Sequence, residues 1–200
     1  SNVTTVQFYD KQSFINPCME SSTRFVDKVI SEVAAMYREA GAPLTTWHFG
    51  GDEAKNIRLG AGLQDINSED KVAWKGDFDL SKQDKPFEQS PQCQSLIANG
   101  TVSDFGHLPS HFAEQVSKIV AEKGIPHFQA WQDGLKYSEG EEAFATESTR
   151  VNFWDVLYWG GTSSVYDWSA KGYDVIVSNP DYVYMDMPYE VDAAERGYYW

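Results

Sequence analysis

Apolar runs rich in β-branched and aromatic residues alternate with amphipathic helical stretches along this chain, and this alternation restricts the fold more than any other feature. The strand-like runs are LTTWHF (residues 44–49), IPHFQAWQDG (125–134), RVNFWDVLYWGG (150–161) and YDVIVSNP (173–180). Strands that are joined through helices pair in parallel by crossover connections. The sequence therefore predicts an α/β fold built on a parallel sheet.

The stretch from residue 21 to residue 41 is the clearest predicted helix. Serines stand at its start, where they can cap the first turn, and Gly41 stands at its end. Pro43 breaks the pattern before the first strand. One face, which we expect to be the buried one, collects the apolar side chains of Phe25, Val26, Val29, Ile30, Val33 and Tyr37.

Two further helices are predicted later in the chain. Residues 107–124 carry Pro109 near the first turn and end at Gly124, and one face holds Phe112, Val116, Ile119 and Val120. A shorter helix is predicted over residues 163–172. Residues 54–106 are polar and show little periodicity, which predicts a long functional loop or an insertion.

Each predicted strand is followed by residues that can take part in chemistry. A tyrosine-rich segment follows the fourth strand, and the first three are followed by Asp52 and Glu53, by Trp131 and Asp133, and by Trp154 and Asp155. Active groups at the C-terminal ends of several strands are typical of (β/α)8 barrels, whereas an open sheet gathers them mainly at one switch point. Only about four of the eight barrel strands are present. Residues 1–200 are therefore predicted to be one partial catalytic domain, an incomplete central portion of a (β/α)8 TIM barrel.

Composition excludes several classes of partner. The formal net charge of −14 opposes binding to nucleic-acid phosphates or anionic lipid, because both partners would be negative. A hydrophobic content of 42% with 14% aromatic residues argues against disorder, and no apolar run reaches the roughly 20 residues that a membrane span needs. On spacing alone, Cys18 and Cys93 fit a disulfide and two buried thiols equally well.

The neighbouring carboxylates Asp52 and Glu53 are the strongest candidates for catalysis. Gly50 and Gly51 allow a sharp turn that presents both side chains to a pocket. Tryptophan faces suit sugar rings, and burial beside them would keep one acid protonated for cleavage of a glycosidic bond while the other stays ionised. Adjacent residues cannot occupy opposite faces of a sugar ring, so the nucleophile must come from elsewhere.

The motif HFGGDE, residues 48–53, resembles the His-x-Gly-Gly-Asp-Glu signature of family 20 glycoside hydrolases, the β-N-acetylhexosaminidases. The words GGDEAKNIRLGAG, AWQDGL, NFWD, NPDYVYMD and ERGYYW are similar to the bacterial chitobiases of that family, and the similarity covers essentially the whole chain. This resemblance implies a retaining exo-β-N-acetylhexosaminidase that removes terminal β-linked N-acetylglucosamine from chitobiose and chitooligosaccharides. It implies no cofactor.

The resemblance also implies substrate-assisted catalysis, in which the substrate's 2-acetamido oxygen attacks the anomeric carbon and forms an oxazolinium intermediate. Glu53 would act as the general acid and then as the base that activates water. Asp52 would orient the acetamido group and stabilise the growing positive charge. Tyr184 would hydrogen-bond the acetamido carbonyl, with the nearby Tyr182 as the competing candidate.

Further residues receive roles from the same resemblance. Trp131 and Trp154 would wall the pocket of the terminal sugar, and Trp200 would stack on the next sugar. A disulfide between Cys18 and Cys93 is implied as well.

Other interpretations stay open beside these. His48 and Asp52 lie four positions apart, but that spacing does not align side chains in a strand and turn, so we expect no metal site. We expect His48 to hydrogen-bond within the wall of the substrate pocket. Asp133 and Asp155 could bind sugar hydroxyls or cap loops. A non-catalytic sugar-binding barrel and a metal-dependent hydrolase of the amidohydrolase kind are the alternative functions.

The expected partners are chitobiose and other N-acetylglucosamine oligosaccharides, with no nucleic acid and no membrane span in this segment. In the family, an arginine from an early strand and residues after the last strand complete the pocket, so the segment alone is expected to be inactive. The N-terminal SNVTTVQFYD has neither the basic segment nor the hydrophobic core of a signal peptide. Together with the implied disulfide and a polymer-derived substrate, this predicts a periplasmic, cell-surface or secreted bacterial enzyme.

Overall fold

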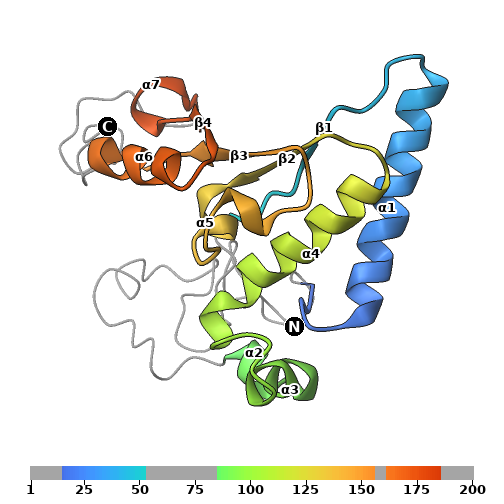
Figure 1. Ribbon diagram of the computed structural model, residues 1–200, viewed down its shortest axis with the longest axis vertical. Helices are drawn as coiled ribbons and strands as arrows, with labels where there is room; N and C mark the ends of the chain where they lie inside the picture. The colour runs from blue at the N-terminus through green and yellow to red at the C-terminus, as the bar shows by residue number, and fades with distance from the viewer. Residues whose placement is uncertain (1–14, 53–84, 156–160, 186–200) are drawn as a thin grey trace, which may run out of the picture. The chain divides into compact units, whose positions relative to one another are not determined.

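The computed structural model describes residues 15–52, 85–155 and 161–185 (Figure 1). Helices and parallel strands alternate in it, as the sequence predicts. The elements in chain order are α1 (Glu20–Glu39), β1 (Thr46–His48), α2 (Pro86–Gln89), α3 (Pro91–Ala98), η2 (Phe105–His107), α4 (Leu108–Glu122), β2 (His127–Trp131), α5 (Gln132–Leu135), η3 (Glu141–Ala143), β3 (Ser148–Phe153), α6 (Gly161–Ala170), β4 (Asp174–Val177) and α7 (Pro180–Val183).

The chain divides into two compact units. The first consists of Ser1–Ser22 and Lys55–Leu108, and the second consists of Thr23–Ala54 and Pro109–Trp200. The first unit therefore takes up most of the stretch 54–106, which the sequence predicts as a loop or insertion. All four described strands belong to the second unit.

The second unit contains a four-stranded parallel sheet with the strand order β1-β2-β3-β4. In register, Thr46 lies opposite His127, His127 lies opposite Ser148, and Arg150 lies opposite Asp174. Spatial order follows chain order, whereas a doubly wound sheet reverses its direction at a switch point. Strands that follow one another in sequence are the arrangement of a (β/α)8 barrel, so the structure confirms the predicted fold class.

The core of the second unit lies between α1, α4 and one face of the sheet. Its fully buried side chains include Ile30 of α1, Val116 and Val120 of α4, Phe128 and Ala130 of β2, and Val151 of β3. Phe128 stacks on Phe144 with ring centroids 5.5 Å apart. Because successive side chains of a strand point to opposite faces, His127, Gln129 and Trp131 lie on the other face of the sheet.

Helical periodicity gave the right helix but too wide a buried face for α1. Ile30 is fully buried, and Val26 and Ala34 pack against the core. The side of α1 that contacts the core is therefore a narrow stripe formed by every fourth residue. Phe25 and Tyr37 were predicted on the buried face but are 59% and 46% exposed. Phe25 lies at the margin of the narrow stripe, and Tyr37 lies in the last turn of the helix.

The predicted face of α4 is confirmed, because Phe112, Val116, Ile119 and Val120 are all buried. The second strand, predicted to end at Trp131 and Asp133, stops at Trp131, since α5 begins at Gln132. The third strand starts at Ser148 and stops at Phe153, close to its predicted end near Trp154.

The first unit holds two short helices that the sequence analysis missed. Prolines 86 and 91 stand in their first turns, where the missing N–H is no loss. The Ser90 hydroxyl caps α3 by accepting the Cys93 N–H at 3.4 Å. With four and eight residues, α2 and α3 are too short to show a helical period.

A disulfide joins Cys18 to Cys93, as the family resemblance implies. Cys93 is fully buried in a small core with Phe87, Val102 and Leu108. The Asn16 side chain also links the residues around the disulfide. Its Oδ1 accepts the Cys18 N–H at 3.0 Å, and its Nδ2 donates to the Ser90 hydroxyl at 3.0 Å. The bond therefore joins the two separate stretches of the first unit.

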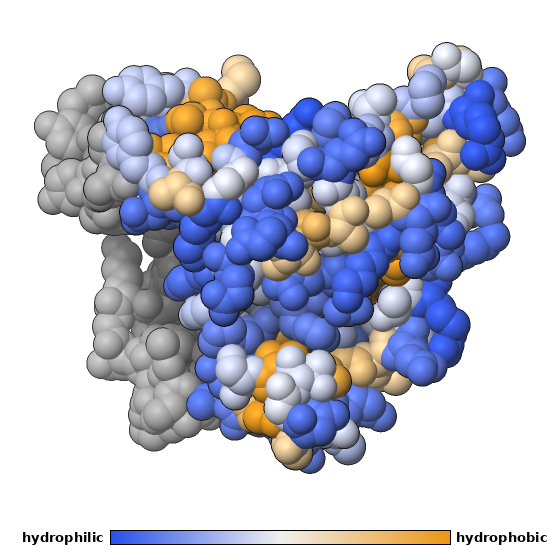
Figure 2. All heavy atoms as spheres, in the orientation of Figure 1, coloured by the Kyte–Doolittle hydropathy of each residue, from blue (hydrophilic) through white to orange (hydrophobic). Residues whose placement is uncertain are grey.

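Apolar side chains reach the surface where the sheet ends at β4. Figure 2 shows a hydrophobic patch over this region on an otherwise mostly hydrophilic face. Val177 of β4 is 61% exposed and Val183 of α7 is 55% exposed. Within the described parts of the chain, no helix has the length and apolar character that crossing a membrane requires.

Candidate active site

The candidate active site lies at the carboxyl ends of the four parallel strands. Parallel strands bring their carboxyl ends to one edge of a sheet, which is where barrel enzymes hold their reactive groups. Asp52 follows β1, Trp131 ends β2, and Trp154 follows β3. Tyr184 follows α7, the short helix after β4. Glu53 and Trp200, which the sequence also predicts to act here, lie outside the described residues.

Two glycines form the turn that carries Asp52. Gly50 and Gly51 have φ angles of +79° and +85°, in the left-handed region that favours glycine. A Cβ on Gly51 would lie 3.0 Å from the Gly134 Cα and 3.0 Å from the Phe49 ring, so the turn packs against the start of α5 without room for a side chain. The exposed side chain of Asp52 follows directly.

His48 joins this turn to the neighbouring strands. Its Nδ1 accepts the Gly50 N–H at 3.0 Å, and its Nε2 lies 3.2 Å from the Asn152 Oδ1. Its ring meets the Trp131 ring edge to face, with centroids 5.5 Å apart. Partial burial lowers the pKa of His48, although the Asn152 hydrogen bond and the Asp52 charge act the other way. The neutral ring accepts at Nδ1 and donates from Nε2, so both ring nitrogens of His48 are hydrogen-bonded.

These two hydrogen bonds also bear on whether His48 and Asp52 could bind a metal ion together. With Nδ1 accepting from Gly50 and Nε2 donating to Asn152, neither nitrogen of His48 has a lone pair left for a metal ion. Among the described residues, no group of three or more His, Cys, Asp or Glu side chains could hold a metal ion.

Asn152 is a site residue that the sequence analysis missed. Its Oδ1 also accepts from the Gln129 Nε2 at 2.5 Å, and its Nδ2 donates to the Ser178 Oγ at 2.8 Å. We call His48, Gln129, Asn152 and Ser178 the polar row, because each comes from or directly follows a different strand of the sheet. The period of two could have revealed it, since Gln129 and Asn152 each precede a predicted wall tryptophan by two residues.

Asp133 and Trp154 form the second feature of the site. The Trp154 indole Nε1 donates to the Asp133 Oδ2 at 2.7 Å, and its backbone N–H donates to the Gln132 Oε1 at 2.7 Å. Burial raises the pKa of Asp133, and the charges of Asp52 and Asp155 add to that rise, while the Trp154 hydrogen bond opposes it. Asp133, whose role the sequence left open, thus holds a tryptophan, and it lies within electrostatic range of Asp52.

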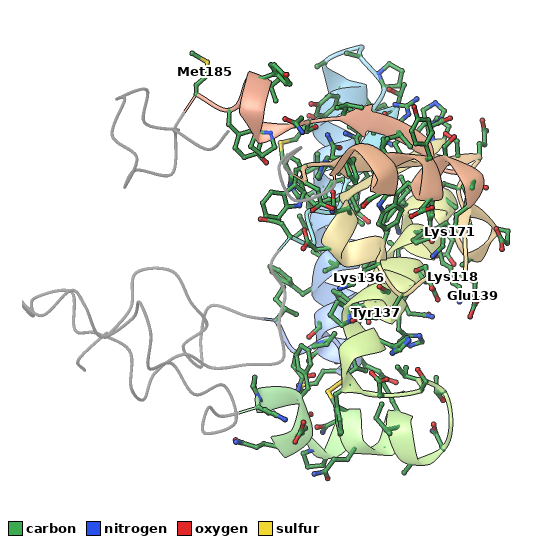
Figure 3. The ribbon with its side chains drawn as sticks, turned by 90° about the vertical axis from the view of Figure 1, so that its left-hand side faces the viewer. Lys118, Lys136, Tyr137, Glu139, Lys171 and Met185 are labelled. Atoms are coloured by element: carbon green, nitrogen blue, oxygen red, sulfur yellow. A yellow bond between two sulfur atoms is a disulfide. The ribbon has the colours of Figure 1, made fainter. Side chains whose placement is uncertain are left out.

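The two tyrosines that compete for one predicted role differ in burial. Tyr182 of α7 is 78% exposed, whereas Tyr184 is half-buried. The next residue, Met185, is 91% exposed and its side chain points away from the ribbon (Figure 3). Asn179, which directly precedes α7, is buried, and its Nδ2 donates to the Asp155 carbonyl at 2.8 Å.

Two curated proteins are similar to this chain over nearly its whole length. The N,N'-diacetylchitobiase of Vibrio harveyi is 88% identical over 200 residues, which are 100% of this chain and 23% of that protein. A beta-hexosaminidase of Vibrio vulnificus is 36% identical over 203 residues, covering 98% of this chain and 20% of that protein. The chain thus spans less than a quarter of the length of these relatives.

Solved structures show the same fold. An exo-β-N-acetylglucosaminidase of family 20 from Vibrio harveyi, in complex with N-acetylglucosamine, superposes with a TM-score of 0.59 at 20% identity, covering 92% of this chain and 22% of that one. A Flavobacterium johnsoniae chitobiase gives a TM-score of 0.55 at 18% identity, covering 84% of this chain and 20% of that one. At such identities the likeness supports the barrel fold alone.

The decisive comparison is with protein families. The model of the family described as "Glycosyl hydrolase family 20, catalytic domain" matches residues 1–200, which is the full length of the chain. Since the match leaves no residue uncovered and the fold agrees, the chain belongs to glycosyl hydrolase family 20 as a segment of its catalytic domain.

Proposed function

We propose that the enzyme containing this segment is a retaining exo-β-N-acetylhexosaminidase that hydrolyses terminal β-linked N-acetylglucosamine from chitobiose and chitooligosaccharides. The observation that carries the proposal is the 88% identity to an N,N'-diacetylchitobiase over all 200 residues. The geometry at the strand ends supports it, because an acidic side chain, Asp52, lies at the same edge as two tryptophans.

The chemistry proceeds in two steps. In the first, the acetamido oxygen of the substrate attacks the anomeric carbon, and the bond to the leaving sugar breaks as Glu53 gives its proton to the leaving oxygen. The product is a cyclic oxazolinium ion. In the second, Glu53 takes a proton from water and the water oxygen bonds to the anomeric carbon. The bond between that carbon and the oxazolinium oxygen breaks, which restores the acetamide. Two inversions at one carbon give net retention.

Asp52 acts on the group that moves. As a carboxylate it accepts a hydrogen bond from the acetamido N–H, which turns the amide oxygen toward the anomeric carbon. It also stabilises the positive charge of the oxazolinium ion. The two-glycine turn gives Asp52 a defined backbone position, and both Asp133 and His48 lie within its electrostatic range.

The aromatic groups hold the sugar. Trp131 and Trp154 offer broad apolar faces to the terminal ring, and the hydrogen bond to Asp133 fixes the plane of Trp154. Trp200 stacks on the next sugar. We assign the acetamido carbonyl to Tyr184 instead of Tyr182, because Tyr182 is 78% exposed while Tyr184 is half-buried.

No metal or cofactor has a part in this scheme, because the substrate's amide supplies the nucleophile and Glu53 moves the proton. The disulfide between Cys18 and Cys93 supports an oxidising location, the periplasm, the cell surface or the medium.

The full-length enzyme with Glu53→Gln tests the proposal. We expect kcat on chitobiose to fall by roughly 10²–10⁴, the usual share of general acid-base catalysis. Glu32→Gln is the matched control, since Glu32 lies on α1 with a side chain 57% exposed. Near-normal turnover by Glu53→Gln would contradict the assignment.

A second comparison tests the substrate's part. Analogues whose 2-acetamido group is replaced by a hydroxyl should be hydrolysed far more slowly, because they lack the attacking oxygen. Equal rates on both would overturn the mechanism. Tight sugar binding without any hydrolysis would select the non-catalytic barrel, and loss of activity with a chelator would select the metal-dependent hydrolase.

A further inference from the structure

The ring of His48 connects the turn before Asp52 to the centre of the sheet. One ring nitrogen accepts the Gly50 N–H at 3.0 Å, and the other lies 3.2 Å from the Asn152 Oδ1. We propose that His48 is a positioning residue that holds the Asp52 turn through its Nδ1 lone pair, and that Asn152 fixes the ring tautomer on which this hold depends. The inference rests on the proposed function only for its kinetic readout.

The polar row determines where the ring proton lies. The Asn152 Nδ2 donates to the Ser178 Oγ at 2.8 Å, so the amide oxygen of Asn152 faces the other way. That oxygen receives the Gln129 amide at 2.5 Å, and it can only accept from His48 as well. The ring proton therefore lies on Nε2, which leaves the Nδ1 lone pair for the Gly50 N–H.

The turn is held at both polar groups of Gly50. The Gly50 carbonyl accepts the Trp131 N–H at 2.9 Å, and the Gly50 N–H donates to His48. Gly50 and Gly51 both have φ angles in the left-handed region, at +79° and +85°, where the backbone of glycine has little preference of its own. The side-chain contact from His48 therefore adds a restraint that two glycines cannot provide, directly before the carboxylate that must meet the acetamido group.

Protonation of His48 removes this hold. A doubly protonated ring carries hydrogen on Nδ1 and cannot accept from Gly50. Among the described residues, Asp52 is the charged group that acts on the ring, and it favours protonation. The groups that face the ring from β2 and β3, Trp131 and Asn152, are uncharged, and partial burial keeps the pKa of His48 low. The hold is thus complete above that pKa and is lost on the acid side of it.

Two substitutions separate the two nitrogens of His48. In His48→Asn the amide oxygen takes the place of Nδ1 and can accept the Gly50 N–H as in an Asx turn. In His48→Gln the amide takes the place of Nε2, so the contact with Asn152 is kept and the one with Gly50 is lost. We expect His48→Gln to lower kcat on chitobiose about ten-fold more than His48→Asn does, since small misplacements of catalytic groups cost up to about 10² in rate. Equal losses, or the reverse order, would overturn the proposal.

A pH profile gives a readout that a purely structural role would not move. Asn152→Asp places a carboxylate beside Nε2, which favours the doubly protonated ring, so the acid limb of kcat should move to higher pH by about one unit or more. In the double variant Asn152→Asp with His48→Asn, this movement should vanish because no imidazole remains. An acid limb that stays in place in Asn152→Asp, or that moves equally in the double variant, would contradict the role of His48.

Crystal structures of the full-length His48→Gln and His48→Asn enzymes test the inference without any activity. We expect Asp52 to be displaced in His48→Gln and to keep its place in His48→Asn. Unchanged positions in both would overturn the positioning role. A wild-type enzyme that releases no N-acetylglucosamine would overturn the proposed function alone, and the displacement of Asp52 would still decide the role of His48.

Discussion

The indole N–H of Trp154 donates to a carboxylate oxygen of Asp133 at 2.7 Å, so an acid after one strand fixes an aromatic side chain after the next. The same carboxyl group interacts electrostatically with Asp52. Under the proposed function Trp154 walls the pocket of the terminal sugar, so we predict that Asp133 acts on sugar binding through the orientation of Trp154.

Removing the acceptor should loosen this wall. In Asp133→Ala the indole N–H loses its partner, which costs about 1–3 kcal/mol, and we expect kcat/KM on chitobiose to fall by about 5- to 150-fold. Asp133→Asn keeps an acceptor oxygen and should lose clearly less. Steady-state kinetics of the two variants decide the point, and indistinguishable losses would mean that the contact does not orient Trp154.

The same carboxyl group gives stability a defined dependence on pH. Burial raises the pKa of Asp133 above its ordinary value of 3.8, so the folded protein holds this proton to higher pH than the unfolded chain does. Its contribution to stability is complete below pH 3.8 and is lost as the pH rises through the folded pKa. Relative to the wild type, Asp133→Asn should therefore gain melting temperature as the pH rises from about 3.5 toward 7. A constant difference across that range would contradict the shift.

Gly51 should tolerate no side chain. Gly51→Ala places a Cβ 3.0 Å from the Gly134 Cα at a φ of +85°, so both strain and backbone overlap result. Gly41→Ala is the matched control, because Gly41 has a φ of +71° and no atom within 4 Å of the place that a Cβ would take. The control should lose about 1–2 kcal/mol from its left-handed backbone alone. We expect Gly51→Ala to lose more stability than Gly41→Ala does and to lose most of its activity. Thermal denaturation and steady-state kinetics of the two variants test this.

The sequence predicted the parts of the fold that repeat at a fixed period. Helical spacing located α1 and α4, and the alternation of elements predicted the parallel sheet. Burial of individual side chains was harder, because a helix faces its neighbours with a stripe narrower than its whole apolar face. Phe25 has the right spacing and is nevertheless 59% exposed.

In the candidate site, too, a local motif predicted some features, whereas others depend on the order of the strands. A short motif with two glycines predicted that Asp52 follows the first strand, and His48 of the same motif contacts Gly50 and Asn152. The partner Asn152 lies 104 positions further along the chain, and its place beside His48 depends on which strands are neighbours. The period of two marks Gln129 and Asn152 within their own strands, but only the strand order shows that Asn152 lies beside His48.

The aromatic centre of the core should carry much of the stability of the second unit. Phe128 is fully buried, with the ring of Phe49 at 5.7 Å and that of Phe144 at 5.5 Å. Phe128→Ala should cost about 3–5 kcal/mol, measured by urea denaturation of the full-length enzyme. Phe25→Ala removes the same group from a 59% exposed position and should change stability little. A comparable loss in both variants would mean that Phe25 is covered in the full-length protein.

The disulfide should decide whether the first unit stays folded. Cys18 and Cys93 are 75 positions apart. A bond that closes a loop of this length lowers the conformational entropy of the unfolded chain, which stabilises the folded state by about 4 kcal/mol. Reduction should therefore expose the small core around Phe87 and Leu108, and limited proteolysis should then cut within residues 85–108 first. A Cys18→Ser, Cys93→Ser double variant should be cut at the same places with and without reductant. If the reduced wild type resists protease as well as the oxidised form does, contacts such as that of Asn16 with Ser90 hold this unit without the bond.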